Sequence, residues 1–261
     1  MPATEITPRS HNSALRQIVG AIPARFASTR LPGKPLRPLA GRPLIEHVYR
    51  RASEARELDR VVVLTDDPRI AETVEGFGGQ VELTPEDCAS GSDRVAFAAR
   101  NWEVSGVVNI QGDEPLIDPQ AIDLVAAHLR EHADAPIVTL AAPASQDERC
   151  NPEVVKVVVG LDDTALYFSR SAIPHLRHDD DQATALRHIG IYGYQRAALL
   201  ELAEMPVSPL EQCESLEQLR ALENGMMIKV LRVSHAWQGV DTMEDLELVE
   251  RILRQADSAS L

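Results

Sequence analysis

Short apolar runs alternate with amphipathic segments in the first half of the chain, and this alternation limits the fold more than any other feature. The apolar runs are short enough to be buried strands and cover residues 18–24, 60–66, 80–84, 106–114 and 135–142. The intervening segments have apolar residues at helical spacing and cover residues 43–55, 68–79, 92–102 and 119–132. Strands separated by helices predict βαβ units, and therefore an α/β fold of three layers around a mostly parallel sheet.

The second half of the chain has a different pattern. Strands are predicted over residues 153–160, 165–174, 187–195 and 227–234, with a helix-rich segment over 196–224 and a last helix over 243–254. We interpret residues 143–235 as a smaller inserted α+β region that shapes a substrate pocket and a subunit interface. The single domain is expected to span residues 17–254, after a flexible polar leader (1–16) and before a short tail (255–261).

One stretch, residues 21–43, is strongly basic within an acidic protein. It contains five cations and no acid, whereas the whole chain has 40 acidic and 26 basic residues and a net charge of −14. This net charge disfavours nucleic acid and anionic membranes as partners, so an anionic small ligand has to be bound locally. Gly33 and Lys34 lie between two prolines, in a stiff turn directly after the first strand. Backbone N–H groups and cations there predict a polyphosphate site, with a solvated basic loop as the alternative.

Carboxylates follow or precede other predicted elements in positions suited to a metal ion. Asp113 ends the strand that contains NIQGDEP, where it could hold Mg²⁺ or simply form a turn. Asp241 opens the last helix in GVDTMEDL, where it could cap the helix unless Thr242 does so. Asp66 in TDDP and the SGSDR segment (90–94) are open to the same two interpretations, ligand contact or capping, the latter by Ser92 in SGSDR.

The remaining compositional signals concern compartment and chemistry. Three widely spaced cysteines without a CxxC pair are typical of reduced thiols in a cytoplasmic protein, and they give no support for a zinc site. No apolar run is long enough to span a membrane, and residues 1–16 lack the apolar core of a secretory signal.

Seven motifs occur in order along the chain and together resemble the 3-deoxy-manno-octulosonate (Kdo) cytidylyltransferases, or CMP-Kdo synthetases. They span roughly residues 18–254 and are IPARFASTRLPGKPL, SGSDR, NIQGDEP, LYFSRSAIP, RHIGIYGY, SPLEQCESLEQLRALENG and GVDTMEDL. The resemblance implies a Rossmann-like nucleotidyltransferase fold, a cytoplasmic homodimer and Mg²⁺ dependence. The implied reaction joins CTP and Kdo to give CMP-Kdo and pyrophosphate, for the lipopolysaccharide core.

The resemblance also implies roles for individual residues of this sequence. The catalytic set would be Arg25, Lys34, Asp113 and Asp241, of which Asp113 and Asp241 would bind the metal. CTP would be bound by Arg25, Ser28, Arg30, Lys34, Asp66, Ser90, Gly91 and Arg94. The sugar site would be lined by Gln111, Arg170, His188, Tyr192, Glu217 and Gln218, with Arg170 as the partner of the sugar carboxylate.

The sequence departs from the resembled family in places that bear on the sugar. Residues 1–17 extend beyond the usual start, residues 175–186 form a shorter segment before the sugar site, and Ser92 replaces a threonine. A cytidylyltransferase for another acidic sugar, 8-amino-Kdo or a sialic acid, is therefore one alternative. A non-catalytic CTP-binding homologue is another, against which the pair Asp113 and Asp241 argues. A dehydrogenase is excluded by the missing glycine fingerprint.

Overall fold

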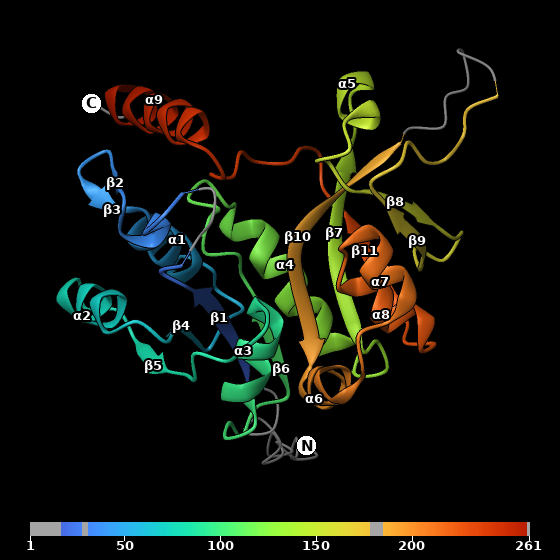
Figure 1. The fold of residues 1–261 in the computed structure, drawn as a ribbon, viewed down its shortest axis with the longest axis horizontal. Helices are drawn as coiled ribbons and strands as arrows, with labels where there is room; N and C mark the ends of the chain where they lie inside the picture. The colour runs from blue at the N-terminus through green and yellow to red at the C-terminus, as the bar shows by residue number, and fades with distance from the viewer. Residues whose placement is uncertain (1–16, 28–30, 178–184, 260–261) are drawn as a thin grey trace, which may run out of the picture.

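A nine-stranded mixed sheet forms the centre of the computed structural model, which describes residues 17–27, 31–177 and 185–259 (Figure 1). Its main path runs in the order β11-β7-β10-β6-β1-β4-β5, and β8 and β9 extend it from β10. The strands of the path are β1 (Ile18–Ala24), β4 (Arg60–Thr65), β5 (Val81–Leu83), β6 (Gly106–Asn109), β7 (Ile137–Pro143), β10 (Leu186–Gln195) and β11 (Ile228–Arg232). The extension consists of β8 (Lys156–Val159) and β9 (Ala165–Ser169), and a separate ribbon of β2 (Pro38–Leu39) and β3 (Arg42–Pro43).

Most neighbouring strands of the main path are parallel, as the alternating pattern predicts. β1 pairs in parallel with both β4 and β6, β4 with β5, and β7 with β11. β10 is the exception, because it lies antiparallel between β6 and β7. The region 143–235 is therefore not a simple insertion beside the sheet, since it supplies β10 to the centre and β11 to one edge.

Helices cover both faces of this sheet and give the expected three layers (Figure 1). The helices of the described residues are α1 (Leu44–Ser53), α2 (Pro68–Gly76), α3 (Gly91–Ala99), α4 (Pro119–Glu131), α5 (Gln146–Cys150), α6 (Arg196–Glu204), α7 (Pro209–Glu214), α8 (Gln218–Glu223) and α9 (Met243–Ala259), of which α9 contacts β2 of the separate ribbon. Side chains of β1 point alternately to the two faces of the sheet, which explains the layers. Ile18 and Ile22 belong to the hydrophobic core that α1 and α4 cover. Val19 and Ala21 belong to the second core, on the opposite face, which α3 and α6 cover. None of the helices in the described ranges is both long enough and apolar enough to cross a lipid bilayer.

Candidate active site

The carboxyl ends of β1 and β6 mark the point at which the strand order reverses. From β1 the sheet continues through β4 to β5 in one direction and through β6 in the other. The loops after β1 and β6 consequently diverge from a common edge, which is where ligands bind in open α/β sheets. A cleft of about 470 Å³ lies there and is lined by Pro23, Ala24, Arg25, Ala27, Lys34, Pro35, Gly91, Gln111, Gly112, Asp113 and Asp241.

The ammonium of Lys34 joins the two predicted metal carboxylates inside this cleft. Its Nζ donates to Asp113 Oδ2 at 2.9 Å and to Asp241 Oδ1 at 3.0 Å, and a third bond goes to the carbonyl of Val240 at 2.9 Å. Burial disfavours the charged ammonium, but the two carboxylates outweigh burial and raise the pKa of Lys34 above its usual range. Segments far apart in the sequence therefore meet around one positive charge.

The basic loop reaches this position through a left-handed backbone at Gly33. Gly33 has φ +68° and precedes a short 3₁₀ turn, Lys34–Leu36, while its N–H bonds the carbonyl of Phe26 at 3.1 Å. A methyl group at Gly33 would lie 3.1 Å from the Phe26 ring, so glycine satisfies both the backbone conformation and the space. Arg25 lines the same cleft and donates to the carbonyl of Ala89 at 3.3 Å.

The opening of α9 leaves Asp241 pointing at the cleft, because Thr242 caps the helix. The Asp245 N–H donates to Thr242 Oγ1 at 3.2 Å, and the Thr242 N–H donates to Asp245 Oδ2 at 2.9 Å. Since Thr242 caps the helix, the Asp241 side chain is not needed as the cap and can line the cleft. The geometry therefore separates the two roles that the sequence leaves open.

Glu114 and Trp237 form a contact beside the carboxylate pair that sequence analysis missed. The indole N–H of Trp237 donates to Glu114 Oε2 at 2.7 Å. Burial, with a further contribution from the adjacent Asp113 carboxylate, raises the pKa of Glu114 to about 7. The position of Glu114 next to Asp113 in NIQGDEP was an available signal, but nothing in the sequence pairs it with Trp237.

A second cavity, of about 340 Å³, adjoins the cleft and shares Gly91 and Gln111 with it. Gln111 Nε2 donates to the carbonyl of Gly190 at 3.1 Å, at the point where a bulge interrupts the pairing of β10 with β7. The structure thus brings most of the predicted sugar-site residues together. The lining of this cavity includes Gln111, His188, Tyr192, Glu217 and Gln218, together with Ser92 and Val155.

His188 is held in the neutral form on β10. Its Nε2 lies 2.9 Å from Thr139 Oγ1, and its ring makes an edge contact with Phe168. Burial, assisted by the positive charge of Arg187, lowers the pKa of His188 to about 3. Burial also raises the pKa of the neighbouring Tyr192 well above its usual range. Both side chains can therefore act as neutral hydrogen-bonding groups at neutral pH.

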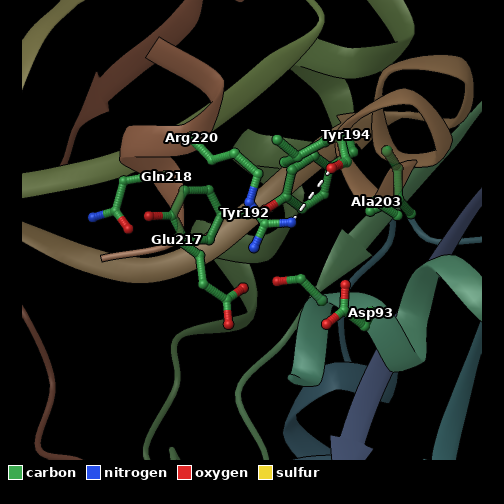
Figure 2. A pocket seen from close by; sticks show the side chains of 10 residues that line it. Asp93, Tyr192, Tyr194, Ala203, Glu217, Gln218 and Arg220 are labelled. Atoms are coloured by element: carbon green, nitrogen blue, oxygen red, sulfur yellow. Dashed lines mark hydrogen bonds between the residues drawn. The ribbon is translucent and has the colours of Figure 1, made fainter. Parts of the chain in front are cut away.

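A third, smaller cavity is lined in part by Tyr192 and Tyr194 (Figure 2). Its volume is about 30 Å³, which is enough for about one water molecule. Figure 2 shows the carboxylates of Asp93 and Glu217 pointing toward each other, with Arg220 above them. Arg220 also forms a buried pair with Glu211, at 2.5 Å from Oε1, which holds α7 against α8. The lining of this cavity includes Tyr192, Glu217 and Gln218, which also line the 340 Å³ cavity.

Three residues predicted to contact CTP lie outside the cleft lining or serve the protein itself. Arg94 has no exposed surface; it bonds the Thr84 hydroxyl and the Pro85 carbonyl, and its Nη2 lies 3.5 Å from Asp66 Oδ1. Neither Arg94 nor Asp66 is among the residues that line the cleft, and a direct contact of either with the nucleotide stays a prediction. Ser90, rather than Ser92, caps α3 by accepting from the Asp93 N–H at 3.1 Å.

The structure does not bring Arg170 into either cavity. It follows β9, and its guanidinium donates to the carbonyls of Glu214 at 2.9 Å and Pro152 at 3.1 Å. In this arrangement Arg170 ties β9 to α7, and its role as the partner of the sugar carboxylate stays a prediction. Ser28 and Arg30, also predicted to bind CTP, lie outside the described residues.

The carboxylate pair has the chemistry of a hard-cation site. Asp113 and Asp241 offer oxygen ligands, and the Lys34 ammonium between them shows that a positive charge fits there. In the described part of the chain no cluster of three or more histidine, cysteine or acidic residues could hold a metal unaided. A divalent cation at this pair would therefore need further oxygen ligands from a substrate or water, as Mg²⁺ sites at phosphates commonly do.

Comparison with known proteins assigns this geometry to a class of enzymes. The family model described as cytidylyltransferase matches residues 19–228. A 4-diphosphocytidyl-2C-methyl-D-erythritol synthase from Anaerococcus prevotii shares the fold, with a TM-score of 0.60 at 14% identity. The fold is thus that of an α/β nucleotidyltransferase, and the family model places the chain among the cytidylyltransferases.

Curated relatives and a solved structure narrow the class. The 3-deoxy-manno-octulosonate cytidylyltransferase of Myxococcus xanthus is 48% identical over 237 residues, which cover 90% of this chain and 96% of that protein. The enzyme of that name from Syntrophotalea carbinolica is 49% identical, covering 91% and 98%. A solved CMP:2-keto-3-deoxy-manno-octonic acid synthetase complexed with CTP superposes with a TM-score of 0.89 at 42% identity, covering 92% and 99%. The chain belongs to the 3-deoxy-manno-octulosonate cytidylyltransferase family.

Proposed function

We propose that this protein transfers CMP from CTP to Kdo, giving CMP-Kdo and pyrophosphate for lipopolysaccharide core synthesis. The observation that carries the proposal is the meeting of Lys34, Asp113 and Asp241 in one cleft at the switch point of the sheet. Relatives named for this activity span nearly the whole chain, and the solved structure that resembles it is complexed with CTP.

CTP is proposed to occupy the larger cleft. Arg25 and Lys34 bring positive charge to the triphosphate, and the first turn of α3 presents backbone N–H groups at Gly91. Because α3 is capped by Ser90, its first turn is fixed before the nucleotide arrives. Arg94 supports the nucleotide site indirectly, because it holds the loop around Thr84 in place.

Mg²⁺ is the proposed cofactor, held by Asp113 and Asp241. When bound there it would offset the charge of the phosphates and polarise the α-phosphate. The chain's own residues would position the reactants. Lys34 would exchange its carboxylate contacts for contacts with phosphate oxygens, so that its charge stabilises the departing pyrophosphate.

Kdo is proposed to bind in the adjoining cavity lined by His188, Tyr192, Glu217 and Gln218. Its anomeric hydroxyl oxygen would form a bond to the α-phosphorus and lose its proton to solvent, while the bond from that phosphorus to the bridging oxygen breaks and pyrophosphate leaves with its electrons. Gln111 lies on the boundary of the two cavities, where it can orient the sugar toward the nucleotide.

The direct test is pyrophosphate release by the purified protein with Mg²⁺. Each of the four nucleoside triphosphates is offered with Kdo, 8-amino-Kdo or N-acetylneuraminate. We expect release only with CTP and Kdo. Release with CTP and another of the sugars would keep the mechanism and change the substrate, and no release despite CTP binding would contradict an enzymatic function.

We further propose a homodimer in the cytoplasm. The β8–β9 hairpin projects at one side of the molecule (Figure 1), where Leu161 is fully exposed and Leu166 is 63% exposed. Burial of such residues against a second copy would remove apolar surface from water. Cys88, Cys150 and Cys213 are free thiols, which suits a reducing compartment. Light scattering after gel filtration should give a dimer mass, and Leu166→Asp should lower it to that of a monomer.

A further inference from the structure

The segment that carries Asp241 has no regular structure of its own and depends on a few specific contacts. It connects β11 to α9 and runs past the loop after β6. The Val240 N–H donates to the carbonyl of Asp113 at 2.8 Å, and the Val240 carbonyl accepts from Lys34. A further side-chain contact between the two segments is the 2.7 Å bond from Trp237 to Glu114.

This contact joins the two carboxylate-bearing loops at neighbouring positions. Glu114 directly follows Asp113, and Trp237 lies four residues before Asp241. The Trp237 ring also packs against the main hydrophobic core, so its position is fixed by more than the hydrogen bond. A rigid side chain anchored in the core therefore holds the loop of Asp113 at a set distance from the segment of Asp241.

We propose that Trp237 is a positioning residue for the Asp113–Asp241 pair, acting through its hydrogen bond to Glu114. The inference rests on the proposed function, in which the pair binds Mg²⁺. Two carboxylates on separate loops bind a small cation well only when their spacing is fixed before the cation arrives. Groups that orient metal ligands from outside the coordination sphere typically change metal affinity about 10- to 100-fold when they are removed.

The chain offers a matched control in its other tryptophan. The Trp102 indole N–H donates to Glu82, at 3.0 Å from Oε2, on the opposite face of the sheet. Trp102→Phe and Trp237→Phe thus remove the same group from the same kind of acceptor while keeping an aromatic ring. Only one of the two bonds lies beside the carboxylate pair.

The experiment measures Mn²⁺ binding by electron paramagnetic resonance, with CTP present and Kdo absent so that no turnover occurs. Trp237→Phe should weaken Mn²⁺ binding about 10-fold or more, whereas Trp102→Phe should stay within about twofold of the wild type. Thermal unfolding of both variants is expected to shift by a similar few degrees. In steady state, Trp237→Phe should raise the Mg²⁺ concentration for half-maximal rate and change KM for CTP much less.

Variants of the acceptor give an independent route if Trp237→Phe is unstable. Glu114→Gln keeps an oxygen that can accept the indole bond and should retain Mn²⁺ affinity, whereas Glu114→Ala should lose it. Equal Mn²⁺ affinity in the Trp237→Phe and Trp102→Phe proteins, or in the two Glu114 variants, would overturn the proposal. A wild-type protein inactive with CTP and Kdo would refute the proposed function alone, since the Mn²⁺ comparison needs no sugar.

Discussion

Asp113 and Asp241 accept hydrogen bonds from the same ammonium, that of Lys34, at 2.9 and 3.0 Å. This relationship means that Lys34 stands where the proposed metal has to bind. The third ammonium proton is also engaged, by the carbonyl of Val240 at 2.9 Å. In the absence of nucleotide, a metal ion therefore has to displace a fully bonded lysine before it can reach the carboxylates.

Lys34→Met should consequently bind Mn²⁺ more tightly than the wild type when no nucleotide is present. The ion pairs are partly open to water, with Asp241 52% exposed, so we expect a gain of about 10-fold, equivalent to about 1.4 kcal/mol. The same change should weaken CTP use, because a phosphate contact is lost. Lys229→Met, which breaks the pair with Asp162 at 3.4 Å, is the control and should leave Mn²⁺ binding unchanged. Equal Mn²⁺ affinity in all three proteins would contradict the competition.

Asp113→Asn should abolish most of the activity without unfolding the protein. The amide keeps the shape of the side chain but lacks the charge that the proposed Mg²⁺ needs, so turnover should fall about 100-fold or more. The rate of CMP-Kdo formation is the measurement, with circular dichroism to confirm the fold. Asp162→Asn, in the β8–β9 turn, should remain fully active. Near-normal turnover of Asp113→Asn would remove this residue from the metal site.

The strand pattern and the motif order predicted much of this arrangement, for a clear physical reason. Runs such as residues 18–24 are apolar on both sides because helices cover both faces of the sheet. The loops after those strands were therefore predicted to contain the ligand-binding residues. The direction of β10 could not be predicted from the sequence, because no local pattern distinguishes an antiparallel strand from a parallel one. Its place depends on pairing with β6 and β7, which are distant in sequence.

The surroundings of Arg94 and Arg170 depend on tertiary contacts that no local sequence pattern reveals. Arg94 follows the start of a helix, where an arginine is normally exposed, and its burial depends on Thr84 and Pro85 from another loop. Arg170 resembles a ligand residue by motif, but its guanidinium is engaged by backbone carbonyls. The contact between Trp237 and Glu114 likewise joins segments that only the fold brings together.

Arg94→Met tests whether this arginine supports the fold rather than the nucleotide. Removing a fully buried guanidinium leaves Asp66 and Thr84 without their partner, so the free energy of unfolding should fall by about 2–4 kcal/mol. KM for CTP should change only modestly. Urea unfolding and steady-state kinetics are the measurements. Arg51→Met, at an exposed pair with Glu54, should cost less than about 1 kcal/mol. A stable Arg94→Met protein with greatly weakened CTP use would instead indicate that Arg94 contacts CTP directly.

His188 should make the protein less stable as the pH falls. Its pKa is about 3 in the folded chain, whereas a free histidine has a pKa of about 6.5. Between these values the unfolded chain takes up a proton that the folded chain does not. The stabilising effect is therefore complete above about pH 6.5 and is lost as the pH falls toward 3. Water in the open cavity beside His188 reduces this effect. We therefore expect the free energy of unfolding to fall by about 1–2 kcal/mol between pH 7 and pH 4.5 because of His188.

His188→Gln removes the titrating group and keeps a side chain that can bond Thr139. Its free energy of unfolding, measured in urea, should depend less steeply on pH than that of the wild type. The exposed His175 gives the control, because His175→Gln should retain the wild-type slope. If His188→Gln and wild type lose stability in parallel below pH 6.5, the buried neutral histidine is not the cause.

Gly33→Ala should impair CTP use as well as stability, because Gly33 sets the position of Lys34. A left-handed conformation costs an alanine about 1–2 kcal/mol, and its methyl would also lie 3.1 Å from the Phe26 ring. Gly41 offers a matched comparison, with φ +83° but no atom within 4 Å of an added methyl. Gly41→Ala should therefore lower the unfolding temperature alone, whereas Gly33→Ala should also raise KM for CTP. Adding Phe26→Leu to Gly33→Ala should recover part of the CTP affinity. Equal kinetics in the Gly33→Ala and Gly41→Ala proteins would show that Lys34 reaches the carboxylates without this constraint.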